Sequence, residues 1–148
     1  MGGFTAIYLK DCSQENIDEQ NKKLAAYKVA KQYRFYSPAD VRKEYEYYLK
    51  GDGNYPEHLF PKEKINSFAD FKKYWSSEAL GEVIIPKLGS LTFDCYFGRT
   101  SKRAMHNIAN YLIDNISLIK GTNGLFSTFV ERCGKYKYVK KELLTLDN

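Results

Sequence analysis

Three cations and two hydroxyl groups lie where a strand-like run gives way to a helical pattern. The run LTFDCYF ends at Gly98, and the apolar residues beyond it repeat at helical spacing. A helix start exposes unpaired N–H groups at the positive end of the helix dipole, so basic residues are disfavoured there unless an anion binds. The sequence therefore predicts an anion-binding turn formed by Arg99, Thr100, Ser101, Lys102 and Arg103.

The other three predicted helix starts carry the opposite charge. Each has a serine at the N-cap position and an acidic residue in the first turn, as the dipole favours. The pairs are Ser13 with Glu15, Ser37 with Asp40, and Ser67 with Asp70. Two interpretations of the basic start stay open: its cations bind an anion, or they face solvent and pair with acids elsewhere. A Walker-type nucleotide loop is excluded, because FGRTSKR lacks the second glycine and the Gly-Lys pair.

His106 follows Lys102 by one helical turn, between the apolar and polar faces of the predicted helix. With Arg99 and Lys102 binding phosphate, His106 is a candidate acid or base of a small phosphate-handling enzyme. No paired carboxylates lie nearby in sequence, so a structural histidine at the boundary is the other interpretation. We favour a non-enzymatic protein without a cofactor. No metal site is expected, because two histidines and three separated cysteines give no ligand spacing.

A second basic stretch, RCGKYKYVKK, interleaves cations with tyrosines. This pattern suits single-stranded nucleic acid, for which aromatic stacking and phosphate attraction combine. Lysines on an exposed edge strand also protect against aggregation, and that interpretation stays open. The residues of this patch are Arg132, Lys135, Tyr136, Lys137, Tyr138, Lys140 and Lys141.

The positive charge of the chain is concentrated in its C-terminal part. The formal net charge is +5, yet the segment from Lys87 to Lys141 holds ten basic and three acidic residues, a net of +7. The remainder is therefore net −2. This asymmetry predicts a binding module for an anionic partner, nucleic acid first and an acidic protein surface second. A protein-interaction or inhibitor module that uses exposed tyrosines is the alternative.

The sequence predicts a cytoplasmic protein without a membrane partner. It contains no run of about 18 apolar residues and no signal peptide. The three cysteines are odd in number and widely spaced, which fits reduced thiols rather than a disulfide framework. The sequence does not specify the oligomeric state of the protein.

The sequence pattern predicts the helices and strands that position these residues. Together they are expected to form one α+β domain over residues 1–148, with a small, mainly antiparallel sheet and about four helices. The longest helix is predicted over Ser101–Ile119, ended by KGTNG, and the segment 125–133 is ambiguous between strand and helix. An aromatic stripe over Phe68–Trp75 is interpreted as core-facing, with a stacking platform as the alternative. The predicted strands are Phe4–Leu9, Glu82–Ile85, Leu91–Phe97 and Tyr136–Val139.

Overall fold

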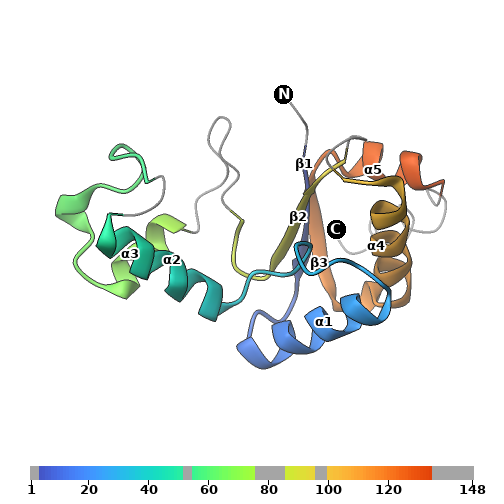
Figure 1. Ribbon diagram of the computed structural model, residues 1–148, viewed down its shortest axis with the longest axis horizontal. Coiled ribbons are helices and arrows are strands. Elements are labelled where there is room, and N and C mark those ends of the chain that lie inside the picture. The colour runs from blue at the N-terminus through green and yellow to red at the C-terminus, as the bar shows by residue number, and fades with distance from the viewer. Residues whose placement is uncertain (1–3, 52–54, 76–85, 96–99, 135–148) are drawn as a thin grey trace.

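The computed structural model describes residues 4–51, 55–75, 86–95 and 100–134. Within these ranges, three strands form an antiparallel sheet in the order β2-β1-β3, and there are five α-helices, of which α2 and α3 lie together to one side of the sheet (Figure 1). The predicted α+β class is therefore confirmed. The strands are β1 (Phe4–Leu9), β2 (Ser90–Asp94) and β3 (Ile119–Gly124).

Serine N-caps start four of the helices, and the sequence predicts three of them, at Ser13, Ser37 and Ser67. Each serine Oγ accepts a hydrogen bond of 3.1–3.3 Å from the backbone N–H three residues later, which satisfies one of the unpaired donors at the helix start. The four caps are Ser13, Ser37, Ser67 and Ser101. The helices are α1 (Gln14–Ala26), α2 (Pro38–Lys50), α3 (Phe68–Trp75), α4 (Lys102–Asp114) and α5 (Phe126–Cys133).

The main hydrophobic core lies between one face of the sheet and the helices α1, α4 and α5. Ile7 of β1 and Leu91 of β2 pair across the strands and are fully buried in this core. The predicted alternation of β2 is confirmed where it is described, since Leu91, Phe93 and Cys95 are buried while Thr92 and Asp94 are partly exposed. Cys95 is therefore the buried core thiol that the sequence indicates.

A second hydrophobic cluster joins α2 and α3, on the opposite side of the sheet from α4 and α5 (Figure 1). Its members are mostly aromatic, with ring centroids 5.2–6.5 Å apart at stacked, tilted and edge-on angles. Phe71 is fully buried and Trp75 is 6% exposed, so the stripe on α3 faces a core, as predicted. Whether residues 1–148 behave as one domain stays a prediction.

The predicted helix Ser101–Ile119 is wrong at its C-terminal end. The helix ends at Asp114, because Asn115 turns its own Nδ2 back to the carbonyl of Tyr111 at 2.8 Å. A 3₁₀ turn follows, and Ile119 then begins β3, where it is fully buried opposite Leu9. Ile119, whose apolar side chain fits the helical spacing, is therefore buried in the main core as part of a strand. KGTNG therefore belongs to a strand and not to a helix end.

The ambiguous segment is helical, as α5. The predicted strands Glu82–Ile85 and Tyr136–Val139 lie outside the described residues, as does the end of Leu91–Phe97.

Candidate functional site: a basic cavity around Tyr8

The predicted anion-binding turn divides into buried and exposed parts. Thr100 is 2% exposed, and the Oγ of Ser101 is engaged as the N-cap of α4, accepting from the N–H of Ala104 at 3.1 Å. Lys102 and Arg103 are exposed, and the first turn of α4 contains no acidic residue. Arg99 lies outside the described residues. The turn thus offers an anion two exposed cations, while both hydroxyl-bearing residues serve the fold.

His106, the candidate acid or base, lies one turn further along α4. Its side chain is partly buried, and its Nε2 makes no hydrogen bond within the described part of the chain. In the second predicted patch, Arg132 occupies the last turn of α5 and is partly buried. The patch residues Lys135, Tyr136, Lys137, Tyr138, Lys140 and Lys141 lie outside the described residues.

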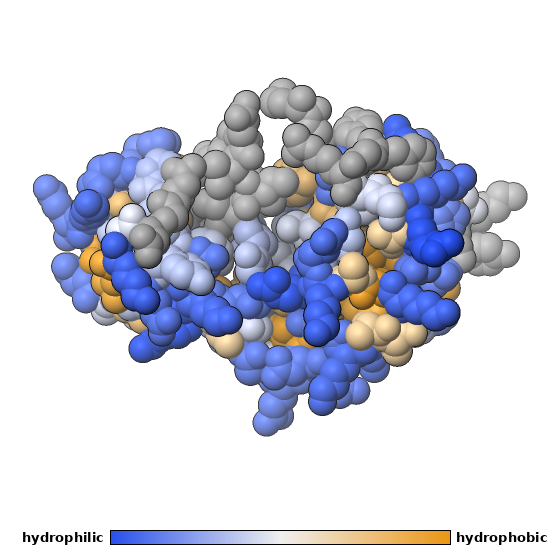
Figure 2. Space-filling model, in the orientation of Figure 1, coloured by the Kyte–Doolittle hydropathy of each residue, from blue (hydrophilic) through white to orange (hydrophobic). Residues whose placement is uncertain are grey.

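The surface of the described residues carries cations, aromatic rings and hollows, each of which can contribute to a binding site. On the face shown in Figure 2, hydrophilic side chains cover much of both ends of the molecule. None of the described helices is long and apolar enough to cross a bilayer. Residues 4–51, 55–75, 86–95 and 100–134 also hold no cluster of three or more His, Cys, Asp or Glu side chains suited to a metal ion.

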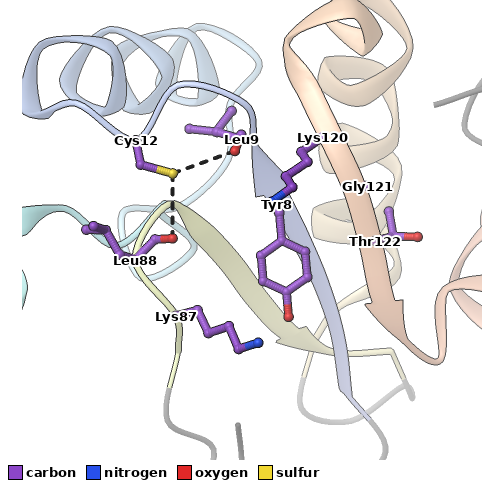
Figure 3. Close-up of a pocket in the computed structure, with 8 residues that line it drawn as sticks. All are labelled: Tyr8, Leu9, Cys12, Lys87, Leu88, Lys120, Gly121 and Thr122. Carbon is purple, nitrogen blue, oxygen red and sulfur yellow. Dashed lines mark hydrogen bonds between the residues drawn. The ribbon is translucent and has the colours of Figure 1, made fainter. Parts of the chain in front are cut away.

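One hollow brings together basic residues that the sequence keeps far apart. This hollow, here called the Tyr8 cavity, has a volume of about 500 Å³ and lies between the end of β1, the turn before β2 and the start of β3 (Figure 3). No acidic residue is found among its described lining residues. They are Tyr8, Leu9, Cys12, Lys87, Leu88, Lys120, Gly121 and Thr122.

Tyr8 stands at the centre of this cavity because it is on the central strand. Its cross-strand neighbours are Ser90 on β2 and Gly121 on β3, two of the smallest residues. Direct cross-strand neighbours lie about 4.5–5.5 Å apart and normally cover one another's side chains. Gly121 has no side chain with which to do so, and Figure 3 shows the Tyr8 ring projecting from β1 between β2 and β3.

The two lysines approach Tyr8 from opposite edges of the sheet. Lys87 lies before β2, and its Nζ is 5.9 Å from the centroid of the Tyr8 ring, within cation–π range. The turn fixes its backbone, since the N–H and Oγ of Ser90 both donate to the carbonyl of Lys87, at 3.0 and 2.7 Å. The cavity therefore holds one cation beside an aromatic ring on the β2 side.

A β-bulge positions the second lysine. Tyr8 pairs with Gly121 and Leu9 with Ile119, so Lys120 has no partner residue on β1. Bulges of this kind bend a strand and redirect a side chain. Lys120 is exposed, and its charge reaches the thiol of Cys12, whose pKa it acts to lower.

Cys12 closes the end of the Tyr8 cavity nearest α1. Its Sγ lies 3.7 Å from the carbonyl oxygen of Leu9 and 3.8 Å from that of Leu88. The turn before β2 packs closely against this sulfur, since a Cβ added to Gly89 would lie 2.4 Å from Cys12 Sγ. Partial burial raises the pKa of the Cys12 thiol despite the opposing effect of Lys120. The thiol is therefore neutral at physiological pH and is a poor nucleophile.

A second hollow, of about 450 Å³, differs in chemistry. It lies beside the aromatic cluster, and Tyr48, Leu49, Tyr55 and Ile65 line it together with a single cation, Lys62. The Tyr8 cavity is thus the better candidate for an anionic ligand, since two lysines converge there. Sequence reasoning missed it because Tyr8, Lys87 and Lys120 come from three separate segments. Only the charge asymmetry of the C-terminal half, which contains both lysines, pointed towards it.

The fold and the site together define an α+β protein with a basic, aromatic-centred cavity on its sheet. The sequence matches no protein family model, and comparison with curated proteins and with solved structures gives no match.

Proposed function

We propose that this protein is a non-enzymatic binding module whose basic C-terminal half engages nucleic acid. The observation that carries the proposal is that Lys87 and Lys120 line one cavity with Tyr8, whose ring centroid lies 5.9 Å from Lys87 Nζ, and that its described lining residues include no acid. Both lysines belong to the segment with the net charge of +7. Phosphate attraction with aromatic contact is the usual combination by which proteins bind nucleic acid strands.

The exposed cations at the start of α4 extend the same chemistry. Lys102 and Arg103 lie where the helix dipole is positive, so they add to a field that attracts phosphate. Such contacts position a nucleic acid backbone without reading its sequence. The proposal therefore expects binding that depends strongly on salt and weakly on base sequence.

The test measures the affinity of the full chain for a fluorescein-labelled oligothymidylate and for a labelled duplex. Fluorescence anisotropy is recorded at several salt concentrations, starting low. Binding to single strands is expected to weaken with a slope of about 0.7 in log K against log salt for each phosphate contact. The double variants Lys87→Ala with Lys120→Ala, and Lys102→Ala with Arg103→Ala, should each bind more weakly and show a shallower slope.

A matched control carries the same change in net charge. Lys43→Ala with Lys64→Ala removes two exposed lysines from the part of the chain that is net −2. This variant should bind like the parent protein. No detectable binding at low salt, or binding that salt does not alter, would refute the proposal. Equal affinity for poly-glutamate, lost in the same two variants, would replace nucleic acid by an acidic protein surface.

A further inference from the structure

We infer that the Tyr8 cavity accepts one nucleotide of a single strand, with its base stacked on Tyr8 and its phosphate held by Lys87 and Lys120. This inference rests on the proposed function and narrows it to a substrate class and a place. It makes the protein a single-strand binder, because a base within a duplex has both faces covered by its neighbours in the stack. A strand can present a base to an aromatic ring only where that base is unstacked.

The surroundings of Tyr8 supply the stacking surface. Tyr8 lies on the central strand β1, which pairs with β2 on one side and with β3 on the other. Ser90 and Gly121 flank it across the strands, and Gly121 lines the cavity without a side chain. Aromatic side chains on the face of a sheet are the groups on which sheet proteins stack single-stranded bases.

The size and polarity of the cavity suit one nucleotide. Its volume of about 500 Å³ falls within the range of about 300–1,000 Å³ that is usual for small-ligand sites. Its polar side-chain groups are two ammonium groups, the hydroxyls of Tyr8 and Thr122, and the thiol of Cys12. The cations suit a phosphate, whereas a hydroxyl can donate to or accept from a base or a sugar.

The bulge in β3 gives the second phosphate contact. In a regular register Lys120 would have paired with a residue of β1, and the extra residue frees it from that constraint. Figure 3 shows Lys87 on the β2 side of the Tyr8 ring, with Lys120 and Thr122 on the β3 side. The phosphate of a nucleotide whose base stacks on Tyr8 thus has a cation within the cavity on either side of the ring.

The first experiment separates stacking from general phosphate attraction. Tyr8→Leu removes the aromatic ring, and Tyr8→Phe keeps it. Tyr8→Leu should lower the affinity for oligothymidylate by about 5- to 150-fold, the loss expected for one base–aromatic stack. Tyr8→Phe should bind within about twofold of the parent protein, and duplex affinity should change little in either variant. Thermal unfolding curves show whether each variant is folded.

The second experiment places the nucleotide in the cavity and needs no substitution. Cys12 lines the cavity and is partly exposed, whereas Cys95 and Cys133 are 0% and 2% exposed. Alkylation by iodoacetamide at mildly alkaline pH is followed by mass spectrometry of the three cysteine peptides. Bound oligothymidylate should slow alkylation of Cys12, while Cys95 and Cys133 stay unmodified unless the protein unfolds. Thymidine 5′-monophosphate tests whether a free nucleotide suffices, and thymidine and inorganic phosphate test each half of the ligand.

The outcomes distinguish this inference from the proposed function. Protection of Cys12 by the oligonucleotide, with or without protection by the mononucleotide, supports the assignment. Salt-dependent binding with equal affinity for single strand and duplex, unchanged in Tyr8→Leu, would overturn it and leave the proposed function standing. A Tyr8→Leu loss without protection of Cys12 would place the strand outside the cavity and overturn the assignment too. Absence of any binding would refute both.

Discussion

The hydroxyl of Tyr111 on α4 donates a hydrogen bond of 2.6 Å to Oε1 of Gln20 on α1, and both side chains are buried within the main core. Gln20 also donates through Nε2 to Oδ1 of Asn16, at 3.1 Å. The pair joins two helices that are 91 residues apart at the point of contact. It therefore fixes how the chain's first helix packs on α4, behind the sheet that carries Tyr8.

Removing the hydroxyl of Tyr111 should destabilise the protein. Tyr111→Phe keeps the ring but leaves the buried Gln20 amide without its donor, which costs about 1–3 kcal/mol of unfolding free energy. Urea unfolding monitored by circular dichroism measures this loss. Tyr27→Phe is the matched control, because the Tyr27 hydroxyl donates to Asp114 at the surface and should matter less. Equal effects of the two substitutions would contradict this account of the buried pair.

The same tyrosine makes stability sensitive to alkaline pH. Burial raises the pKa of Tyr111 above its ordinary value of about 10. In the unfolded chain the hydroxyl ionises near pH 10, whereas in the folded chain it stays protonated. Its stabilising contribution is therefore complete below pH 10 and declines as the pH rises, by at most about 1.4 kcal/mol per pH unit.

Comparison with Tyr111→Phe isolates this effect from the other tyrosines. Unfolding free energies are measured for both proteins from pH 8 to 11. The difference in stability between the parent protein and Tyr111→Phe should be constant up to about pH 10 and shrink above it. A constant difference over the whole range would show that Tyr111 titrates alike in the folded and unfolded chains.

Local chemistry accounts for what the sequence predicts well. The N-caps Ser13, Ser37 and Ser67 are predictable because a cap depends on residues within one helical turn. The aromatic stripe on α3 is equally local, since its helical spacing puts Phe71 and Trp75 on one face.

Long-range pairing accounts for what the sequence cannot predict. IKGTNG has two glycines and little alternation, and it becomes β3 only because β1 pairs with it on the edge opposite β2. The bulge that leaves Lys120 unpaired follows from that same register. The Tyr8 cavity needs β1, β2 and β3 together, so no single segment carries its signature. The turn at Arg99–Arg103, in contrast, stands out locally, and its role stays a prediction.

The end of α1 is formed by a residue whose type does not indicate a helix end. Lys28 adopts a left-handed conformation with φ of 63°. The N–H of Val29 donates to the carbonyl of Leu24 at 3.1 Å, and the N–H of Lys28 donates to that of Ala25 at 3.0 Å. These two bonds form a Schellman motif, whose left-handed position normally holds glycine.

Lys28→Gly should therefore stabilise the protein. Glycine adopts positive φ without the steric cost that a lysine bears, and the expected gain is about 1 kcal/mol. Lys31→Gly is the control, because it removes the same charge from an exposed neighbour whose φ is not positive. That control should be neutral or destabilising, since glycine there only adds freedom to the unfolded chain. Thermal melts of the two variants decide the point, and a lower melting temperature for Lys28→Gly would refute it.

Gly124 separates the cost of positive φ from the cost of close packing. It ends β3 with φ of 77°, and a Cβ there would lie 2.1 Å from the carbonyl oxygen of Phe4. That oxygen accepts the hydrogen bond from the N–H of Leu125 at 2.8 Å. An added methyl group must therefore displace the backbone where β1 and β3 begin to pair.

Gly124→Ala should lower the unfolding free energy by about 2–4 kcal/mol, of which roughly half is steric overlap and the rest is the positive φ. Gly51→Ala is the matched control, since Gly51 has φ of 76° but no atom within 4 Å of an added Cβ. That control should cost only about 1 kcal/mol. Urea unfolding of both variants gives the difference directly. If the two substitutions cost the same, the backbone of Phe4 gives way freely, and the register that positions Tyr8 beside Gly121 is softer than the packing at Gly124 implies.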